Sequence, residues 1–526
     1  MLAVPLLKAE DLQGLDAETA SKVMTMVQRL TQELHLKETK LQKLTFELAR
    51  LKALKFGART EAMDAEQRRL FEETLAEDEA SLRAQLEALQ NAKAAADAAA
   101  GGLDRQAPKR TPKRQPLPGH LRRQEHRHEP EDTTCPQPEC GKPMQRIGED
   151  VSERLDIIPA EFFVHRHVYG KWACRCCQTL VQEPAAPQVI DKGQPTAGLV
   201  AHTLVSRFVD HVPYYRQEAI NARSGVHTPR STLAAWSGAG GAALEPLYEV
   251  HKAFVLACAV LHADETPVAM LDPGAGKTKK AYVWGYARSE FDSQPGVIYE
   301  FCAGRGGKYP VAFLEGWNGT LICDDYKGYE TLFKLGERVE AGCAVHSRRK
   351  FDELIKHGHS EVAAEAVRRM AVVFKVEQQI QHCEPAERLA LRQQITRPHW
   401  DELHAWLQLE RQRVPDGSAI ARALDYSLRR WEPLSRFLHD GDVSPHNNHL
   451  ENLLRPWAVG RKAWLFAGSE LAGQRAAMVM SLVQSAKLNG HDPWGYLKDV
   501  LERLPGHPAS GIEELLPHRW KPPTAR

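Results

Sequence analysis

The chain has 526 residues, a formal net charge of +1, 26% charged residues and 43% hydrophobic residues. This length predicts about three to four domains, and the near-neutral charge excludes a protein that is polycationic overall, so DNA binding would need local basic patches. No leader peptide opens the sequence and no apolar run approaches the ~20 residues of a membrane span, so we expect a cytoplasmic protein. Ten clustered cysteines in such a chain favour metal binding over a disulfide scaffold.

The N-terminal region predicts a coiled coil. Apolar residues recur at alternating four- and three-residue steps over about four heptads, interrupted only by Lys37. The seam consists of Val23, Val27, Leu30, Leu34, Leu41, Leu44, Leu48 and Leu51. A second helical pattern runs from Leu70 to Leu89. A homodimer or a helical hairpin would both bury the seam, and an amphipathic helix packed on its own domain is a further alternative.

A basic segment follows an alanine-rich tract, Gly101-Gly102 and several prolines, which together mark a linker. Between positions 105 and 127 it carries one acidic residue, Glu125, against Arg105, Lys109, Arg110, Lys113, Arg114, Arg122, Arg123 and Arg127. Such a run could bind phosphates by counterion release. A solvated, disordered linker is the alternative.

Four cysteines in two close pairs predict a small zinc-binding module. The pairs are Cys135 with Cys140 and Cys174 with Cys177. Four thiolates suit a tetrahedral structural Zn²⁺, which would stabilise a unit too small to have a core of its own. Cys176 could replace Cys177 as a ligand, and buried cysteines without a metal are the other interpretation.

Short helices are predicted over residues 188–250, with Pro213, Gly225 and Pro229 between them. A helix that begins near Ser231 could meet a phosphate with its N-terminus, as in a helix-turn-helix. Packing of these helices onto a neighbouring domain explains the pattern equally well.

Two acidic residues follow apolar runs that predict buried strands. The run 255–261 leads to Asp264, and the run 320–323 leads to Asp324. Further strands are expected at residues 281–287 and 297–301. A strand-end aspartate is often a turn former, so neither residue alone indicates a metal site.

A short helix at residues 309–315 and a strand at residues 344–346 complete this predicted unit. That strand would lead to Arg348, Arg349 and Lys350, which would lie beside the acids and contact phosphates. Surface salt bridges are an equally good interpretation of Arg348 and Arg349.

Glu451 lies in a helical pattern formed by Leu450, Leu453, Leu454 and Trp457. Two strand carboxylates and one helical carboxylate would form a hard oxygen site suited to Mg²⁺ or Mn²⁺. Two such metals can activate a nucleophile and stabilise a leaving oxygen on phosphorus.

Cations and aromatic rings follow Glu451. Arg455, Arg461 and Lys462 could hold a phosphate backbone, and Trp464 and Phe466 could stack an unpaired base. Burial of the two rings in a core is the more common outcome.

Six ordered sequence blocks carry a resemblance to transposases of the IS66 family of bacterial insertion sequences. They are HVPYYRQEAINARSGVHTPRSTLAAW (211–236), LHADETPV around Asp264, DDYKGY from Asp324, AGCAVHSRRKF (341–351), the block around Glu451, and SAKLNGHDPWGYLKDVLERL (485–504). The match runs nearly end to end, with two departures from the family pattern. Asp325 stands where a glycine is usual, which leaves the choice between Asp324 and Asp325 open, and His446 stands where an aspartate is common.

The resemblance implies a ribonuclease-H-like catalytic domain whose DDE triad is Asp264, Asp324 and Glu451. It also implies a zinc-binding domain whose second cysteine pair is Cys174 and Cys177, DNA ends as substrate, and small accessory proteins encoded by the same element. The expected function is therefore metal-dependent DNA strand cleavage and strand transfer in the bacterial nucleoid. The alternatives are a nuclease that only cuts and a non-catalytic DNA-binding descendant of a transposase.

The expected fold is multidomain α+β, with a helical insertion inside an α/β catalytic domain. The expected regions are a coiled coil (1–104), a basic linker (105–130), a zinc-binding module (131–187), a helical region (188–250), the first catalytic part (251–351), a helical insertion (352–440), the second catalytic part with Glu451 (441–470) and a helical C-terminus (471–526). Two helices joined at Asn489-Gly490 are expected in the last region.

Overall fold

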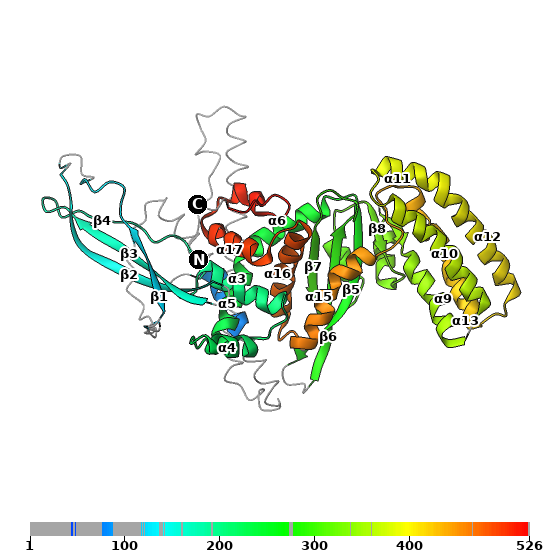
Figure 1. Cartoon of the computed structure of the whole chain (residues 1–526), viewed down its shortest axis with the longest axis horizontal. Coiled ribbons are helices and arrows are strands. Elements are labelled where there is room, and N and C mark those ends of the chain that lie inside the picture. Colours follow the sequence, from blue (N-terminus) through cyan, green and yellow to red (C-terminus); the bar gives the residue numbers. More distant parts are fainter. Residues whose placement is uncertain are drawn as a thin grey trace, which may run out of the picture.

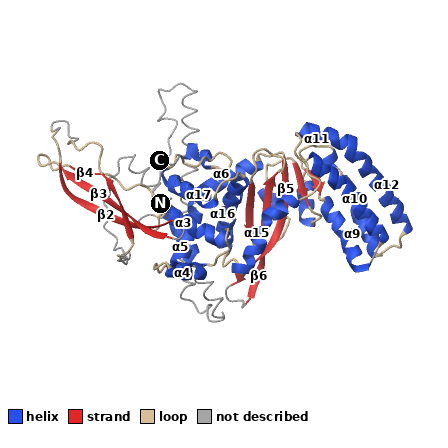
Figure 2. Cartoon of the chain, viewed as in Figure 1, coloured by secondary structure: helices blue, strands red, loops and turns tan. Residues whose placement is uncertain are grey.

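A computed structural model describes residues 44, 45, 48, 76–87, 117, 119, 121–135, 140, 142–158, 161–190, 193–272, 277–336, 338–358, 360–464 and 466–523. Three parts follow one another along the long axis (Figure 1): an arm of long strands, a central body of helices and a sheet, and a bundle of helices at the opposite end. Figure 2 shows that strands dominate the arm and helices dominate the far bundle. None of the described helices is long and apolar enough to cross a membrane.

The arm contains β1 (Arg122–His128), β2 (Gln145–Ile158), β3 (Glu161–Ala173) and β4 (Leu180–Gln182). β3 pairs with all three other strands, and its pairing with β1 is parallel. The linker expected over residues 105–130 is therefore wrong at its end, because residues 122–128 form a strand. The other five cations of that segment lie outside the described residues.

Aromatic rings interlock along one face of the β1–β3 pair. His126 and His128 of β1 alternate with His165 and His167 of β3, with ring centroids 5.0 to 5.2 Å apart. The alternation arises because side chains two residues apart share a face of a strand. It gave no signal at the sequence level, since Arg127 and Arg166 separate the histidines and the strands are about 40 residues apart.

The helical region packs into the core of the body. Its helices are α3 (Ala197–Phe208), α4 (Tyr214–Arg223), α5 (Arg230–Ala243) and α6 (Glu245–Leu256). Leu199, Leu204 and Leu233 are buried in one cluster with residues of the sheet and the C-terminal helices. Packing onto the neighbouring domain therefore explains the helical pattern.

The central sheet has five strands in the order β7-β6-β5-β8-β9. The strands are β5 (Val260–Asp272), β6 (Lys277–Arg288), β7 (Val297–Cys302), β8 (Thr320–Cys323) and β9 (Val339–Gly342). β5, β6 and β7 are antiparallel, whereas β8 and β9 run parallel to β5. The predictions for β6, β7 and β8 are confirmed, and α7 (Lys308–Phe313) lies within two residues of its predicted bounds.

Two predicted strands of this unit are wrong in position. The run 255–261 straddles the end of α6 and the start of β5, and β5 continues eight residues past Asp264. Pro267 lies within β5, although proline cannot donate to a ladder. It is tolerated because the recorded β5–β8 pairing spans only residues 260–262, so Pro267 faces β6 alone. The other error is residues 344–346, which begin helix α9 and not a strand.

The far bundle is the segment expected as a helical insertion. It contains α9 (Ala344–Gly358), α10 (Glu361–Ile380), α11 (Pro385–Leu391), α12 (Arg397–Arg413), α13 (Ala419–Arg429) and α14 (Trp431–Leu434). A further short helix, α8 (Glu330–Lys334), lies between β8 and β9 in the chain. Its apolar residues share a core with the β8–β9 edge of the sheet, through Ile322 and Ala341. The bundle therefore extends from the sheet edge next to β9.

Three C-terminal helices complete the body: α15 (Asn448–Trp464), α16 (Glu470–Leu488) and α17 (Pro493–Arg503). The predicted break at Asn489-Gly490 is confirmed, and Gly490 has a φ of +76°. Trp464 and Phe466 are each 8% exposed, so they belong to the core and cannot stack a base.

Residues 76–87 form a helix docked against α16. Arg475 of α16 is buried and binds Asp78 at 2.6 Å and Glu77 at 3.2 Å. Leu44 is buried with Leu82, Leu86 and the partly buried Leu48 and Leu471. This part of the seam therefore packs within its own chain, while Val23, Val27, Leu30, Leu34, Leu41 and Leu51 lie outside the described residues.

Candidate active site and cysteine cluster

Asp264 and Asp324 are placed side by side by the pairing of β5 with β8. The parallel register joins His262 to Ile322, and continuing it by two residues brings Asp264 level with Asp324. Neighbouring strands lie about 4.8 Å apart, so Asp264 on β5 lies beside the segment that directly follows β8. Asp264 lies inside its strand and not at its end, contrary to expectation, whereas Asp324 follows its strand directly.

Asp325 is engaged away from the acidic pair. Its carboxylate binds Arg430 at 2.8 Å and Arg429 at 3.2 Å, both from the end of α13. Asp324 instead accepts the backbone N–H of Tyr326 at 3.0 Å and has no described ion-pair partner. Of the two adjacent carboxylates, Asp324 is therefore the one available to a metal.

Asn447 anchors the start of α15, the helix that carries Glu451, to β5. The Asn447 side chain donates to the Ala263 carbonyl at 2.9 Å and contacts His262 Nδ1 at 2.9 Å. The Asn447 backbone N–H lies 3.2 Å from Cys343 Sγ. Glu451 lies one helical turn later, and its charge acts on Asp264. His446, the second departure, lies 3.7 Å from Glu290.

The charges of the two other acids act on Asp264. Burial and the neighbouring charges of Glu265, Asp324 and Glu451 raise the pKa of Asp264 to about 8. Like charges disfavour ionisation, and a cation among them would reverse this effect. Glu451 Oε1 is buried without a hydrogen-bond partner among the described residues. A buried carboxylate oxygen without a hydrogen bond is a candidate ligand for a divalent cation.

Two basic side chains approach Glu451 from α9. His346 Nε2 lies 3.8 Å from Oε1, and Arg349 Nη2 lies 3.6 Å from Oε2. Ligand atoms of Cys343, His346 and Glu451 all fall within 4.8 Å of one another, whereas the three acids do not form such a group. Burial raises the pKa of Cys343 to about 11, so its protonated thiol is a poor ligand. The ligand atoms of Asp264, Asp324 and Glu451 are therefore spaced more widely than those of the groups that could hold one ion.

A cleft of about 1090 Å³ opens in front of Asp324. One wall comes from the sheet and α9, and the other from α13 of the far bundle. Cationic residues on its lining are Arg305, Arg349, Lys350, Arg422 and Arg429. Their number suits a phosphate-bearing ligand.

The six cations predicted to contact DNA lie in different surroundings. Arg349 and Lys350 line the cleft, and Arg348 lies 3.6 Å from Asp352 beside a second cleft. Arg455 and Lys462 are exposed on α15. Arg461 donates to the Pro267 carbonyl at 2.7 Å, so its guanidinium fastens α15 to β5. This contact favours a structural role for Arg461.

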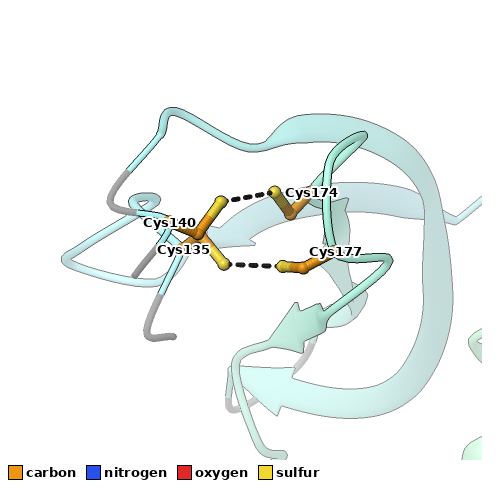
Figure 3. A group of neighbouring side chains, drawn as sticks. All are labelled: Cys135, Cys140, Cys174 and Cys177. Atoms are coloured by element: carbon orange, nitrogen blue, oxygen red, sulfur yellow. Dashed lines mark hydrogen bonds between the residues drawn. The ribbon is translucent and has the colours of Figure 1, made fainter. Parts of the chain in front are cut away.

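The four predicted cysteines converge at the tip of the arm (Figure 3), where their sulfur atoms all lie within 4.8 Å of one another. Cys135 Sγ is 2.9 Å from Cys177 Sγ, and Cys140 Sγ is 3.6 Å from Cys174 Sγ. Hydrogen bonds from Cys135 and Thr179 lower the pKa of Cys177 to about 6, which favours its thiolate. Cys176 is exposed and outside this group. Four converging sulfurs are the donor set of a structural zinc site.

Several functional neighbours escaped the sequence reasoning. Glu265 is adjacent to Asp264, and its side chain is 1% exposed. Glu265 Oε1 lies 2.5 Å from Arg305 Nη2. Asn447, His346 and Arg305 lie about 20 to 185 residues from their partners in the chain. Only the tertiary structure brings them to the acids. The local sequence offered two signals, the residues ETP directly after Asp264 and the two asparagines shortly before Glu451.

Comparison with known families gives the class of protein that this fold and site define. Residues 192–475 match the transposase IS66 family, and residues 481–518 match the IS66 C-terminal element. Residues 132–178 match the zinc-finger binding domain of transposase IS66, and residues 43–125 match the description "Transposase C of IS166 homeodomain". The chain belongs to the IS66 family of transposases.

Relatives of similar length occur in Sinorhizobium fredii (strain NBRC 101917 / NGR234). Uncharacterized protein y4qI is 38% identical over 415 residues, which cover 77% of this chain and 76% of the relative. Uncharacterized protein y4hP is 35% identical over 428 residues with the same coverages, and uncharacterized protein y4jD is 35% identical over 418 residues, 77% of this chain and 81% of the relative. The similarity therefore spans most of each chain.

Proposed function

We propose that this IS66-family protein cleaves DNA strands at the ends of an insertion sequence and joins them to target DNA. The observation that carries this proposal is that the charges of Asp324 and Glu451 act on the buried Asp264, and that Asp324 lines a cleft with several cations. The five-stranded mixed sheet with helices on its faces supports a ribonuclease-H-like assignment for this domain.

The chemistry follows from the donor set. Mg²⁺ or Mn²⁺ held by the three carboxylates would supply an activated water or 3′-hydroxyl and stabilise the leaving oxygen. Asp264 and Asp324 provide oxygen ligands from adjacent strands, and Glu451 provides the third from α15. Arg349 holds Glu451 in place, while Lys350 and the exposed Arg455 and Lys462 are suited to phosphates along the DNA.

We also propose that one Zn²⁺ is held by Cys135, Cys140, Cys174 and Cys177. The sulfur cluster and the zinc-finger family match support it. The ion would stabilise the tip of the arm, because Met144 is the only further buried apolar residue of the cysteine cluster among the residues that the structure describes.

Strand cleavage and joining on DNA that carries the element's own ends, with Mg²⁺ or Mn²⁺, tests the proposal. We expect Asp264→Asn, Asp324→Asn and Glu451→Gln each to lower both steps by at least about 100-fold, because metal ligands stabilise transition-state charge. DNA binding and the unfolding midpoint should stay near the wild-type values. The matched control is Glu502→Gln, an exposed carboxylate on α17 that should retain full activity.

Other outcomes would redirect the assignment. Cleavage without joining would identify a nuclease, and binding without either step would identify a non-catalytic descendant. An inactive Asp325→Asn protein together with an active Asp324→Asn protein would move the metal ligand by one position.

A further inference from the structure

Arg305 is an active-site cation for which the proposed chemistry has no role so far. It lies in the loop between β7 and α7 and lines the same cleft as Asp324. Its Nη2 and Nε bind Glu265 Oε1 at 2.5 and 2.6 Å. The Arg305 side chain is 43% exposed, whereas that of Glu265 is 1% exposed. The buried carboxylate thus holds a partly exposed guanidinium at the cleft wall.

Two tyrosines fix this pair further. The guanidinium carbon of Arg305 lies 3.8 Å from the centre of the Tyr326 ring, and the Tyr326 hydroxyl donates to the Arg305 backbone carbonyl. The Tyr329 hydroxyl donates to Glu265 Oε2 at 3.2 Å. Tyr326 and Tyr329 follow Asp324 closely in the chain. The position of Arg305 is therefore tied to the segment that carries Asp324.

The arrangement leaves one edge of the guanidinium for a ligand. Glu265 binds the Nε–Nη2 edge, and Nη1 has no hydrogen-bond partner among the described residues. A planar guanidinium can bind a carboxylate on one edge and a phosphate oxygen on the other. Ordering of a long side chain costs conformational entropy, and an ion pair whose cation is partly exposed to water adds little net stability by itself. A fixed cation beside metal-binding carboxylates is instead suited to phosphate recognition.

Resting on the proposed function, we propose that Arg305 contacts a non-bridging phosphate oxygen of the scissile strand at or next to the cleavage point. Glu265 and Tyr326 act as positioning residues that keep the guanidinium in the cleft. The ligand is a phosphodiester of DNA, recognised by charge and geometry without reading a base.

DNA ends that carry a neutral methylphosphonate at a single position give the direct test. The positions are the scissile phosphate and the two phosphates on either side, one per substrate. On ordinary DNA we expect Arg305→Ala to lower single-turnover cleavage by on the order of 100-fold, as for the loss of one charge-stabilising donor. At one of these positions the methylphosphonate should lower the cleavage rate of the wild type by at least about tenfold. The same methylphosphonate should lower the cleavage rate of Arg305→Ala by less than about twofold.

A purely structural role predicts different results. If Arg305 served only to neutralise Glu265, the double variant Glu265→Gln/Arg305→Gln would recover activity and overturn the proposal. Additive effects at every position, or cleavage by Arg305→Ala within about twofold of wild type, would overturn it as well. Lys334→Ala, an exposed cation on α8, is the control and should behave as wild type at each position.

Binding measurements keep this inference separate from the proposed function. The same substrates are titrated in Ca²⁺, and their affinities are read by fluorescence anisotropy. One outcome is that the effects of the methylphosphonate and of Arg305→Ala on affinity are non-additive at one position, while the wild type cleaves no DNA in Mg²⁺ or Mn²⁺. This outcome would uphold the Arg305 contact and reject the strand-transfer function. Cleavage by the wild type with additive affinities and rates would do the reverse.

Discussion

At the scale of single residues, the cysteine cluster predicts the metal content of the purified protein. Four sulfurs come together, from Cys135, Cys140, Cys174 and Cys177, and Cys176 is exposed and outside this group. We expect purified protein to carry one zinc, and replacement of Cys177 by Ser to remove it, since a closed sulfur site needs all four thiolates. Metal analysis of the purified protein measures the zinc content. The absorption spectrum of the cobalt-substituted protein reports thiolate ligands.

Cys176→Ser is the matched control, one residue away, and should retain the metal. Loss of zinc from Cys176→Ser with retention by Cys177→Ser would exchange the two ligands. Chelation of the wild-type protein should also expose the tip of the arm to proteolysis.

A buried histidine predicts a pH dependence of stability. His251 of α6 is 0% exposed and contacts the Val297 carbonyl and Ser485 Oγ. Burial lowers its pKa from 6.5 to about 4. Between these values the unfolded chain binds more protons, so stability is present above about pH 6.5 and is lost as the pH falls through 4. A shift of this size corresponds to ~3 kcal/mol.

Urea unfolding of wild type and His251→Gln at pH 7.5 and pH 4 measures the effect. The loss of stability on acidification should be smaller in the variant. His399→Gln, on an exposed part of α12, should leave the wild-type pH profile unchanged. Equal acid sensitivity of His251→Gln and wild type would contradict the assignment.

At the scale of elements, two arginines connect the far bundle to the chain that precedes Glu451. Arg392 is buried with Glu377 at 2.7 Å and donates to the carbonyls of Phe437, Asp440 and Val443 at 2.9 Å each. Arg388 donates to the Gly441 carbonyl at 2.7 Å. The loop 437–443 is therefore fastened to the bundle, and the bundle helps to place α15.

Removal of Glu377 should disturb this connection. Glu377→Ala leaves Arg392 buried without its counter-ion, which costs about 3–5 kcal/mol of unfolding free energy. Chemical denaturation measures the loss, and limited proteolysis should detect new cleavage near residues 437–443. Glu402→Ala, on the exposed face of α12, should cost less than about 0.5 kcal/mol. A similar small cost for Glu377→Ala would show that the loop is held by other contacts.

At the scale of the whole molecule, strand joining needs two DNA ends in one complex. The described part of the heptad seam, Leu44 and Leu48, packs against Leu82, Leu86 and Leu471 of its own chain. The rest of the seam lies outside the described residues, and there a parallel homodimer stays a prediction. A shared seam would couple two active sites in one assembly.

Replacement of Leu34 and Leu41 by Lys places like charges in that seam, at a cost of several kcal/mol in order of magnitude. We expect light scattering to show a monomer, with joining lost more severely than DNA binding. Gln32→Lys with Thr39→Lys adds the same charge opposite the seam and should leave the mass unchanged. A monomeric parent protein, or an unchanged mass for the Leu variant, would mean that the whole seam closes within one chain.

Local pattern alone was enough for several features. The apolar run before Asp324 ends at Cys323 as predicted, Glu451 lies on a helix, and the four predicted cysteines meet. Hydrophobic periodicity and ligand spacing are properties of neighbouring residues, so they survive without knowledge of the fold. The charge arrangement around them is not such a property.

The tertiary structure decided what depends on distant partners. β1 exists because β3 offers it an edge, Asp264 lies inside a strand because β6 supports β5 beyond β8, and Asp325 is drawn away by Arg429 and Arg430. The sequence by itself determined the chemical groups, namely three acids, four thiols and scattered cations. Their meeting was decided by strand register and helix docking, because hydrogen-bond pairing and burial act between residues that may be hundreds of positions apart.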